Sequence, residues 1–315
     1  MRYYPVLITT LNRYEHFRRC VESLARCTHA DRTELVIGLD YPPAEKYVSG
    51  YRQIKDYLPS ITGFAKVTVM ERDHNYGAIR NCRSLIAYSS QYYDACILSE
   101  DDNEFAPAFL DFMNKALDMY KDDDRVKTVG GYCHLEFDGL ADKGVHFTYD
   151  NCAWGVGLWS HKEQVSRSWQ DYLWLWKSPR DFWRIFSVNP SVAKMFDTMM
   201  HKKAYWSDIV RTVANIHAGT YQVVPVRTLV RNHGYDGSGI HCDTRHARRL
   251  AGQSFYEGST YQIGSQPVAL TIPRRVFFFC QLPDNRLKAW LLVVRKLVTI
   301  LIYKVYCPFG KNSGQ

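Results

Sequence analysis

Three consecutive acidic residues are the part of this sequence best suited to chemistry. The segment ILSEDDNEFAP (97–107) places Glu100, Asp101 and Asp102 directly after an apolar run and directly before a stretch with helical periodicity. Like charges at this spacing repel, and an unpaired buried carboxylate is costly. The arrangement therefore requires a cation, a basic partner or open water. The simpler alternative is an acidic helix N-terminus, which the helix macrodipole favours.

The elements that must position these acids follow from the first 130 residues. Four apolar runs each precede a segment of helical character: PVLITT (5–10), TELVIGLD (33–40), KVTVMER (66–72) and DACILSE (94–100). Strand and helix alternating four times predict an α/β fold, with a Rossmann-like, mainly parallel central sheet and helices on both faces. In such a sheet, ligands bind at the carboxyl ends of the strands.

Polar residues, and one glycine in a loop, follow the ends of the predicted strands. In chain order, they are Thr10 and Arg13, then Asp40, then Asn75, Gly77 and Arg80, and finally Glu100, Asp101 and Asp102. We expect them to meet in one crevice, whose carboxylates and bases suit a phosphate-bearing ligand with a divalent metal. The alternatives are local: Thr10 as a helix cap, Asp40 as a turn residue and Arg80 as a solvated helix residue.

These segments together resemble a known family. In order and spacing, PVLITTLNR, CVESL, LVIGLD, RDHNYGAIRN and CILSEDDNEFAPAFLDF are similar to the nucleotide-binding half of GT-A glycosyltransferases. They are close to the inverting family-2 type and similar to Golgi N-acetylglucosaminyltransferases with an EDD motif. The resemblance, over residues 3 to 245, implies a GT-A fold that transfers a hexosyl or N-acetylhexosaminyl group from a nucleotide sugar. It implies Asp102 as the ligand of Mn²⁺ or Mg²⁺, with Glu100 and Asp101 near the ribose or the metal's waters.

The second half must supply the acceptor site and the catalytic base. Inverting transfer needs a carboxylate that removes a proton from the attacking hydroxyl. Asp208 in AYWSDIVRTV and Asp150 in FTYDNCAWGVGLW are the candidates. The resemblance implies an acid near the start of a helix, so we expect Asp208 to be the base and Asp150 to lie with the acceptor. An acid that serves only the helix dipole is an equally good interpretation of Asp208.

Two glycine-rich segments are candidates for ligand contacts. In AWGVGLWSHK (153–162), Trp154 and Trp159 are expected to stack on the acceptor or donor sugar. In LVRNHGYDGSGIHC (229–242), the resemblance implies that His233 or His241 completes the metal site or contacts the diphosphate, and we expect Asp236 to contact the acceptor. Turn or core positions are the alternative for both histidines.

The positive charge of the chain is concentrated at its C-terminus. Residues 271–315 contain eight Lys or Arg and one Asp, whereas the whole chain has a net charge of +8. The nearly neutral remainder disfavours nucleic-acid binding. The segment RLKAWLLVVRKLVTILIYKVY predicts an amphipathic helix that lies on an anionic membrane surface or packs on protein. Its apolar positions are Leu287, Trp290, Leu291, Val294, Leu297, Val298, Leu301, Ile302 and Val305.

The expected organisation has three parts. Residues 1–130 would bind the nucleotide sugar, 131–270 the acceptor, and 271–315 the membrane. The N-terminal sequence contains no secretory signal and the nine cysteines form no CxxC pair, which together predict a cytoplasmic protein, peripheral on the inner face of the membrane. A glycan or lipid-linked acceptor and surface polysaccharide biosynthesis fit this setting. The alternatives are a nucleotidyltransferase, disfavoured because TTLNRYEHF has no glycine-rich phosphate loop, and a non-catalytic sugar-binding scaffold.

Overall fold

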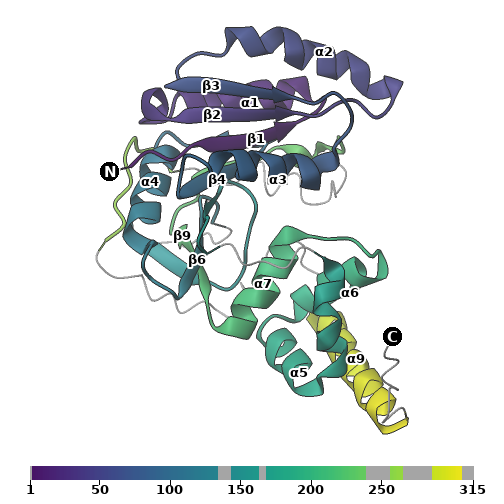
Figure 1. Cartoon of the computed structure of the whole chain (residues 1–315). Helices are drawn as coiled ribbons and strands as arrows, with labels where there is room; N and C mark the ends of the chain where they lie inside the picture. Colours follow the sequence, from purple (N-terminus) through teal and green to yellow (C-terminus); the bar gives the residue numbers. More distant parts are fainter. Residues whose placement is uncertain (1, 134–142, 163–167, 239–255, 265–285, 307–315) are drawn as a thin grey trace. The chain divides into compact units, whose positions relative to one another are not determined.

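The computed structural model describes residues 2–133, 143–162, 168–238, 256–264 and 286–306. His241 lies outside these residues. The chain divides into two compact units (Figure 1). The first contains Met1–Thr148, Cys152–Glu163 and Gln222–Leu270, and the second contains Tyr149–Asn151, Gln164–Tyr221 and Thr271–Gln315. The three-part division of roles expected from the sequence stays a prediction.

The first unit is built on one eight-stranded sheet, with strand order β3-β2-β1-β4-β8-β6-β9-β7. Its strands are β1 (Val6–Thr10), β2 (Glu34–Leu39), β3 (Lys66–Glu71), β4 (Ala95–Glu100), β6 (Val126–Gly130), β7 (Val145–Thr148), β8 (Val156–Trp159) and β9 (Tyr221–Pro225). Strands β3, β2, β1 and β4 are parallel neighbours. Strand β8 is antiparallel to β4 and to β6, so β6 runs in the same direction as β4. The predicted α/β fold with a mainly parallel central sheet is confirmed.

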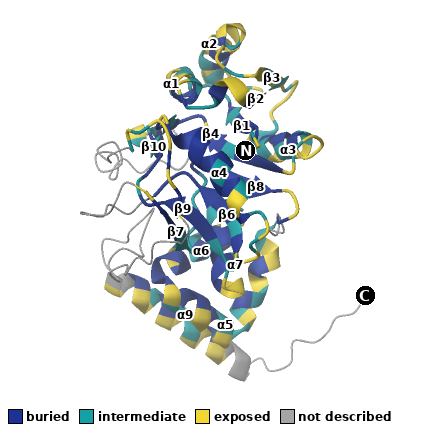
Figure 2. Ribbon diagram, turned by 90° about the vertical axis from the view of Figure 1, so that its left-hand side faces the viewer, coloured by how far each residue is buried: buried dark blue, intermediate teal, exposed yellow. Residues whose placement is uncertain are grey.

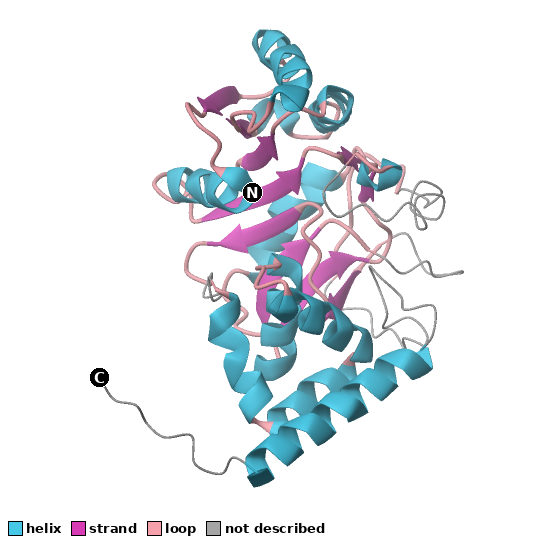
Figure 3. Ribbon diagram, turned by 90° about the vertical axis from the view of Figure 1, so that its right-hand side faces the viewer, coloured by secondary structure: helices cyan, strands magenta, loops and turns pink. Residues whose placement is uncertain are grey.

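Helices cover both faces of this sheet (Figure 3). They are α1 (Tyr14–Ala25), α2 (Val48–Tyr57), α3 (Gly77–Ser89) and α4 (Phe109–Tyr120), with short 3₁₀ helices η1 (Ala30–Arg32), η2 (Glu45–Tyr47), η3 (Leu58–Ser60) and η5 (Gly234–Asp236). Successive residues of a strand point to opposite faces. On β8, Leu158 belongs to a cluster with Leu85 of α3. Its neighbour Gly157 faces Met113 and Leu117 of α4, so α3 and α4 lie on opposite faces.

A buried lysine binds the backbone carbonyl groups at the end of α4 and in the turn that follows it. The Lys162 side chain is 8% exposed, and its Nζ donates to the carbonyl oxygens of Tyr120 at 2.7 Å, Asp123 at 2.9 Å and Val126 at 3.1 Å. It also lies 4.3 Å from the centre of the Trp159 ring. Burial lowers the pKa of Lys162. The three carbonyls replace the water that an ammonium group would otherwise bind.

A short ribbon joins the acidic motif to a segment far along the chain. Strand β5 (Asn103–Phe105) begins directly after Asp102, and it pairs antiparallel with β10 (Val230–Asn232). In this register Asn103 lies opposite Asn232. The glycine-rich segment that begins at His233 is thereby placed at the acidic motif, more than 120 residues away in sequence.

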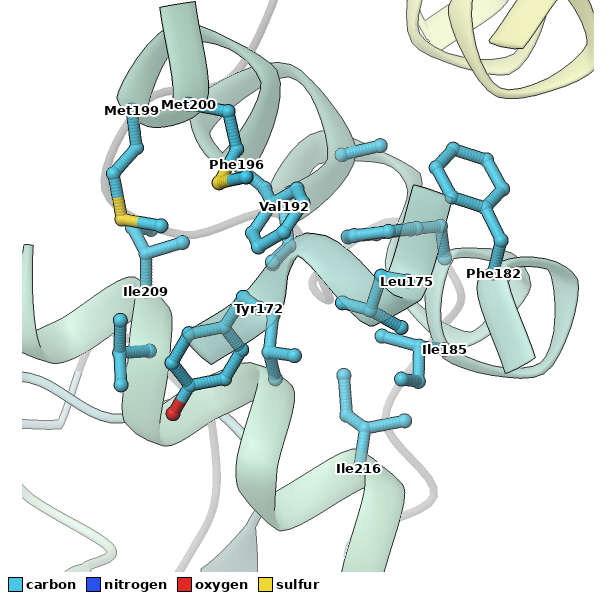
Figure 4. Close-up of a cluster of buried hydrophobic side chains, with 14 of the residues drawn as sticks. Tyr172, Leu175, Phe182, Ile185, Val192, Phe196, Met199, Met200, Ile209 and Ile216 are labelled. Atoms are coloured by element: carbon cyan, nitrogen blue, oxygen red, sulfur yellow. The ribbon is translucent and has the colours of Figure 1, made fainter. Parts of the chain in front are cut away.

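The second unit is helical. It contains η4 (Trp169–Lys177), α5 (Pro179–Val188), α6 (Pro190–His201), α7 (Ser207–Ala218) and α9 (Arg286–Tyr306). Pro179 and Pro190 begin their helices directly after Ser178 and Asn189, whose side-chain oxygens accept backbone N–H bonds, as is typical of helix N-termini. The buried side chains form one apolar cluster that includes Phe182, Phe196 and Ile216 (Figure 4). Within the described residues, no helix has the length and apolar character needed to cross a membrane.

Candidate functional site

The two buried aspartates of the acidic motif share a basic partner. Strands β1 and β4 are parallel neighbours, so their carboxyl ends lie together. Arg13, which precedes α1, forms ion pairs with Asp101 and, through Nη1 at 2.8 Å, with Oδ2 of Asp102. The Thr10 hydroxyl donates to Oδ2 of Asp101 at 2.9 Å. Burial raises the pKa of Asp101, although Arg13 opposes the shift. Two carboxylates thus share one guanidinium, while Glu100 is exposed.

The β5–β10 ribbon supplies the remaining contacts of Asp102. Nδ2 of Asn232 donates to Oδ1 of Asp102 at 2.7 Å and to Oδ1 of Asn103 at 3.0 Å. The backbone N–H of His233 donates to the carbonyl oxygen of Asp102 at 2.8 Å. A Cβ atom at Gly234 would lie 2.1 Å from Oδ2 of Asp102, so only glycine leaves this carboxylate in place. Asn232 was not among the residues predicted from the sequence; its position at a strand end before His233 was the available signal.

The His233 imidazole is held by a different acid. Its Nε2 lies 2.6 Å from Oε2 of Glu104, and the hydrogen bond from His233 lowers the pKa of Glu104. The main chain of His233 therefore contacts the acidic motif, while its side chain pairs with Glu104 on β5. Metal ligation by His233 stays a prediction. Nearby, Asp236 lies 3.1 Å from Nε2 of His16 and accepts the N–H of Ser238 at 2.9 Å.

Asp40 organises the loop that leads into α3. Its carboxylate is 5% exposed, and Oδ1 accepts the backbone N–H groups of Tyr41 at 2.9 Å and Tyr76 at 2.8 Å. The Asn75 amide donates to the carbonyl oxygen of Tyr41 at 2.7 Å. Asp40 thus links the end of β2 to the loop after β3. Its contact with a phosphate-bearing ligand stays a prediction.

The start of α3 is open and carries an exposed cation. Gly77 has φ of +72°, a left-handed conformation that favours glycine, and a Cβ there would contact nothing within 4 Å. The Arg80 guanidinium lies over the Tyr76 ring, with its Cζ 3.9 Å from the ring centre, and its Nη1 lies 3.3 Å from Nε2 of His74. These contacts hold the Arg80 guanidinium at the surface above the first turn of α3.

The two tryptophans expected to contact sugar differ in their surroundings. Trp159 is 1% exposed on β8, and its Nε1 donates to the carbonyl oxygen of Leu117 at 3.2 Å. The prediction for Trp159 is therefore wrong: it is a core residue, because its strand position faces α4. Trp154 is 8% exposed and packs edge-on against two tyrosine rings. The centre of its ring lies 4.6 Å from that of Tyr132 and 5.8 Å from that of Tyr235. Its sugar contact stays a prediction.

Both candidate bases belong to the second unit. Asp150 accepts a hydrogen bond from Nδ2 of Asn189 at 3.0 Å, and burial raises its pKa to about 6. Its neighbour Asn151 is tied to α7 through a hydrogen bond from its backbone N–H to Oγ1 of Thr212 at 2.9 Å. Asp208 lies in the first turn of α7 and is partly buried. The pKa of Asp150 is thus shifted towards the pH range in which general bases act. Asp208 has the helix position that was expected from the sequence.

The acidic pair suits a hard divalent cation. No cluster of three or more His, Cys, Asp or Glu residues placed to hold a metal occurs in the parts of the chain that the structure describes. Mg²⁺-type cations, however, commonly take one or two carboxylates and complete their shell with substrate phosphates and water. Asp101 and Asp102 supply such oxygen ligands, and the backbone of Gly234 packs closely against Oδ2 of Asp102. In this donor set Arg13 now occupies one oxygen of each carboxylate.

Comparison with known proteins gives only distant similarity. No family model and no curated protein matches the chain. Among solved structures it is similar to Staphylococcus aureus TarS 1-349, with a TM-score of 0.43 and 8% identity over 96% of this chain and 82% of that chain. TarS 1-349 in complex with UDP-GlcNAc gives a TM-score of 0.34 and 14% identity over 49% of this chain and 45% of that one. The first match, to TarS, spans only 28% of that chain's length. Likeness at these TM-scores carries no functional inference.

Proposed function

We propose that this protein is a divalent-metal-dependent, inverting glycosyltransferase that uses a nucleotide-sugar donor. One observation carries the proposal: Thr10 and Arg13, at the end of β1, meet Asp101 and Asp102, at the end of β4. Hydroxyl, guanidinium and paired carboxylates at adjacent carboxyl ends of parallel strands form the kind of site that binds a nucleotide diphosphate with a cation.

Each side chain has a part in donor binding. Asp102, with Asp101, would hold Mn²⁺ or Mg²⁺, which when bound neutralises charge on the leaving diphosphate. Arg13, released from one carboxylate, would then be positioned to bind a phosphate oxygen. Asp40 and the loop at Asn75 would contact the base and ribose, and the free N–H groups at the start of α3 favour an anion.

Asp208 would act as the base. In a single displacement, its carboxylate removes the proton of the acceptor hydroxyl while that oxygen attacks the anomeric carbon, and the nucleoside diphosphate departs with the donor oxygen. This order of bond making and breaking inverts the anomeric centre. Asp150, with its raised pKa, would bind the acceptor next to α7.

The proposed setting is the cytoplasmic face of a membrane. A hexosyl or N-acetylhexosaminyl group would be transferred to a glycan or lipid-linked acceptor during assembly of a surface polysaccharide. The basic C-terminal segment, with eight Lys or Arg and one Asp in residues 271–315, supports a peripheral association with anionic lipid.

Donor binding tests the proposal directly. Thermal shift is measured with UDP-, GDP-, CMP- and dTDP-sugars, with and without Mn²⁺, on the wild type and on Asp102→Asn. We expect one nucleotide class to raise the melting temperature only with Mn²⁺, and the variant to lose this shift. Asp94→Asn is the matched control, because Asp94 lies at the amino end of β4 and pairs with Arg2. A shift that needs no metal, or that survives in Asp102→Asn, contradicts the assignment.

Should no donor bind, a non-catalytic scaffold becomes the better interpretation. Pyrophosphate release from a sugar 1-phosphate and a nucleoside triphosphate would instead identify a nucleotidyltransferase. Product stereochemistry, read by NMR of the new anomeric proton, separates inversion from retention once the donor is known.

A further inference from the structure

Helix α9 has two separate apolar faces. On one side, Ala289, Val293 and Ile300 are at most 3% exposed, and Val293 and Ile300 belong to the core of the second unit. Another side of the helix is exposed (Figure 2). Seven large apolar residues of α9 are 37% to 64% exposed. These are Leu287, Trp290, Leu291, Val294, Val298, Leu301 and Ile302, called the α9 stripe below.

The spacing of the α9 stripe shows that it is one continuous surface. Its members recur every three or four residues, which places them along one side of a helix. The packed residues Val293 and Ile300 are seven apart and define a different side. Membrane binding and packing on protein were alternatives for this helix. It packs through one face and leaves seven of the nine predicted apolar positions exposed, while Leu297 packs against the core of the second unit.

A second helix extends the exposed apolar surface. Trp183 on α5 is 44% exposed, and the centre of its ring lies 5.9 Å from that of Trp290. Tryptophan favours the interface between lipid and water, since its large ring is apolar and its N–H group still needs a polar partner. The pair therefore lies at the edge of the α9 stripe as an interfacial anchor would.

The charge on α9 indicates which partner covers the stripe. The helix sequence has five basic residues and no acidic one. Lys296 is neutralised by Asp197 at 2.7 Å, whereas Arg295 is exposed. A second copy of this helix would bring like charges together, while an anionic bilayer offers both apolar chains and negative headgroups.

We propose that the α9 stripe and Trp183 insert into the interfacial region of an anionic bilayer, with α9 lying in the membrane plane. At 1.5 Å per residue the helix is about 31 Å long. This inference deepens the proposed membrane association and uses no residue of the donor site.

Vesicle co-sedimentation tests whether the α9 stripe is the surface that binds the bilayer. We expect the wild type to bind phosphatidylcholine–phosphatidylglycerol vesicles and to bind pure phosphatidylcholine at least about tenfold more weakly. Leu291→Gln, Val294→Gln and Val298→Gln together should weaken binding to anionic vesicles by more than about tenfold, because they remove apolar contacts without changing the charge. The matched control replaces Val69, Ile79 and Met119, which are exposed apolar residues of the first unit, by Gln.

Two further measurements keep the test decisive. Lipids brominated on their acyl chains should quench wild-type fluorescence, and Trp290→Phe should lose part of that quenching; this result needs no destabilising change. Donor-induced thermal shift should be equal in the wild type and in the stripe variant, so failure of membrane binding is distinguishable from failure of the glycosyltransferase assignment. The proposal is overturned if the stripe variant binds vesicles like the wild type, or if the stripe variant only converts a dimer to a monomer.

Discussion

Replacing Arg13 by Gln removes the cation that pairs with both Asp101 and Asp102. The side chains of the two aspartates are 7% and 9% exposed, and that of Arg13 is 20% exposed. Removing one partner of a buried ion pair typically costs about 3–5 kcal/mol, because the remaining charge stays buried without compensation. Since Gln retains one hydrogen bond, we expect Arg13→Gln to lower the free energy of unfolding by about 3 kcal/mol.

The assay is urea unfolding at pH 7, followed by far-UV circular dichroism. Arg18→Gln, on the helix that follows Arg13, is the matched control, since Arg18 pairs with Glu15 and Glu22 at the surface. Asp101→Asn should relieve the effect, because it leaves a single carboxylate at the site. In that background we expect the cost of Arg13→Gln to fall by about 1–2 kcal/mol.

Two results would refute this reasoning. The first is a cost of Arg13→Gln no larger than that of Arg18→Gln, which would mean that water already compensates the aspartates. The second is an equal cost of Arg13→Gln in the wild type and in the Asp101→Asn background, which would mean that the guanidinium acts through packing. Neither result depends on a donor or a metal ion.

Three other changes are open to the same kinds of measurement. Gly234→Ala should weaken metal-linked donor binding, read by thermal shift, since its Cβ would displace Asp102; unchanged binding would contradict the close approach. Burial raises the pKa of Asp150 to about 6, so the folded state holds this proton more tightly and stability falls as pH rises from about 4 to 6; Asp150→Asn should flatten that part of the pH–stability curve. Lys162→Met should lower stability by about 1–3 kcal/mol, because three carbonyls lose their donor.

The sequence by itself determined the parallel half of the fold. Each of its strands is a short apolar run followed by a segment whose apolar residues recur at helical spacing. Both patterns can be read from residues that are close together in the sequence. The polar residues at the strand ends were identifiable for the same reason: in a parallel sheet, position along the chain predicts the edge at which a side chain lies. Thr10, Arg13 and the two aspartates were therefore predicted as neighbours, and they contact one another.

Only the tertiary structure decided which partner each of these groups has. Asn232 and Gly234 reach Asp102 because β10 pairs with β5 across more than 120 residues, and no local pattern encodes that register. Trp159 belongs to the core because its strand position faces α4. The apolar stripe of α9 was visible in the sequence, but which face packs depended on α5 and α6, since burial is a property of neighbouring elements and not of the helix alone.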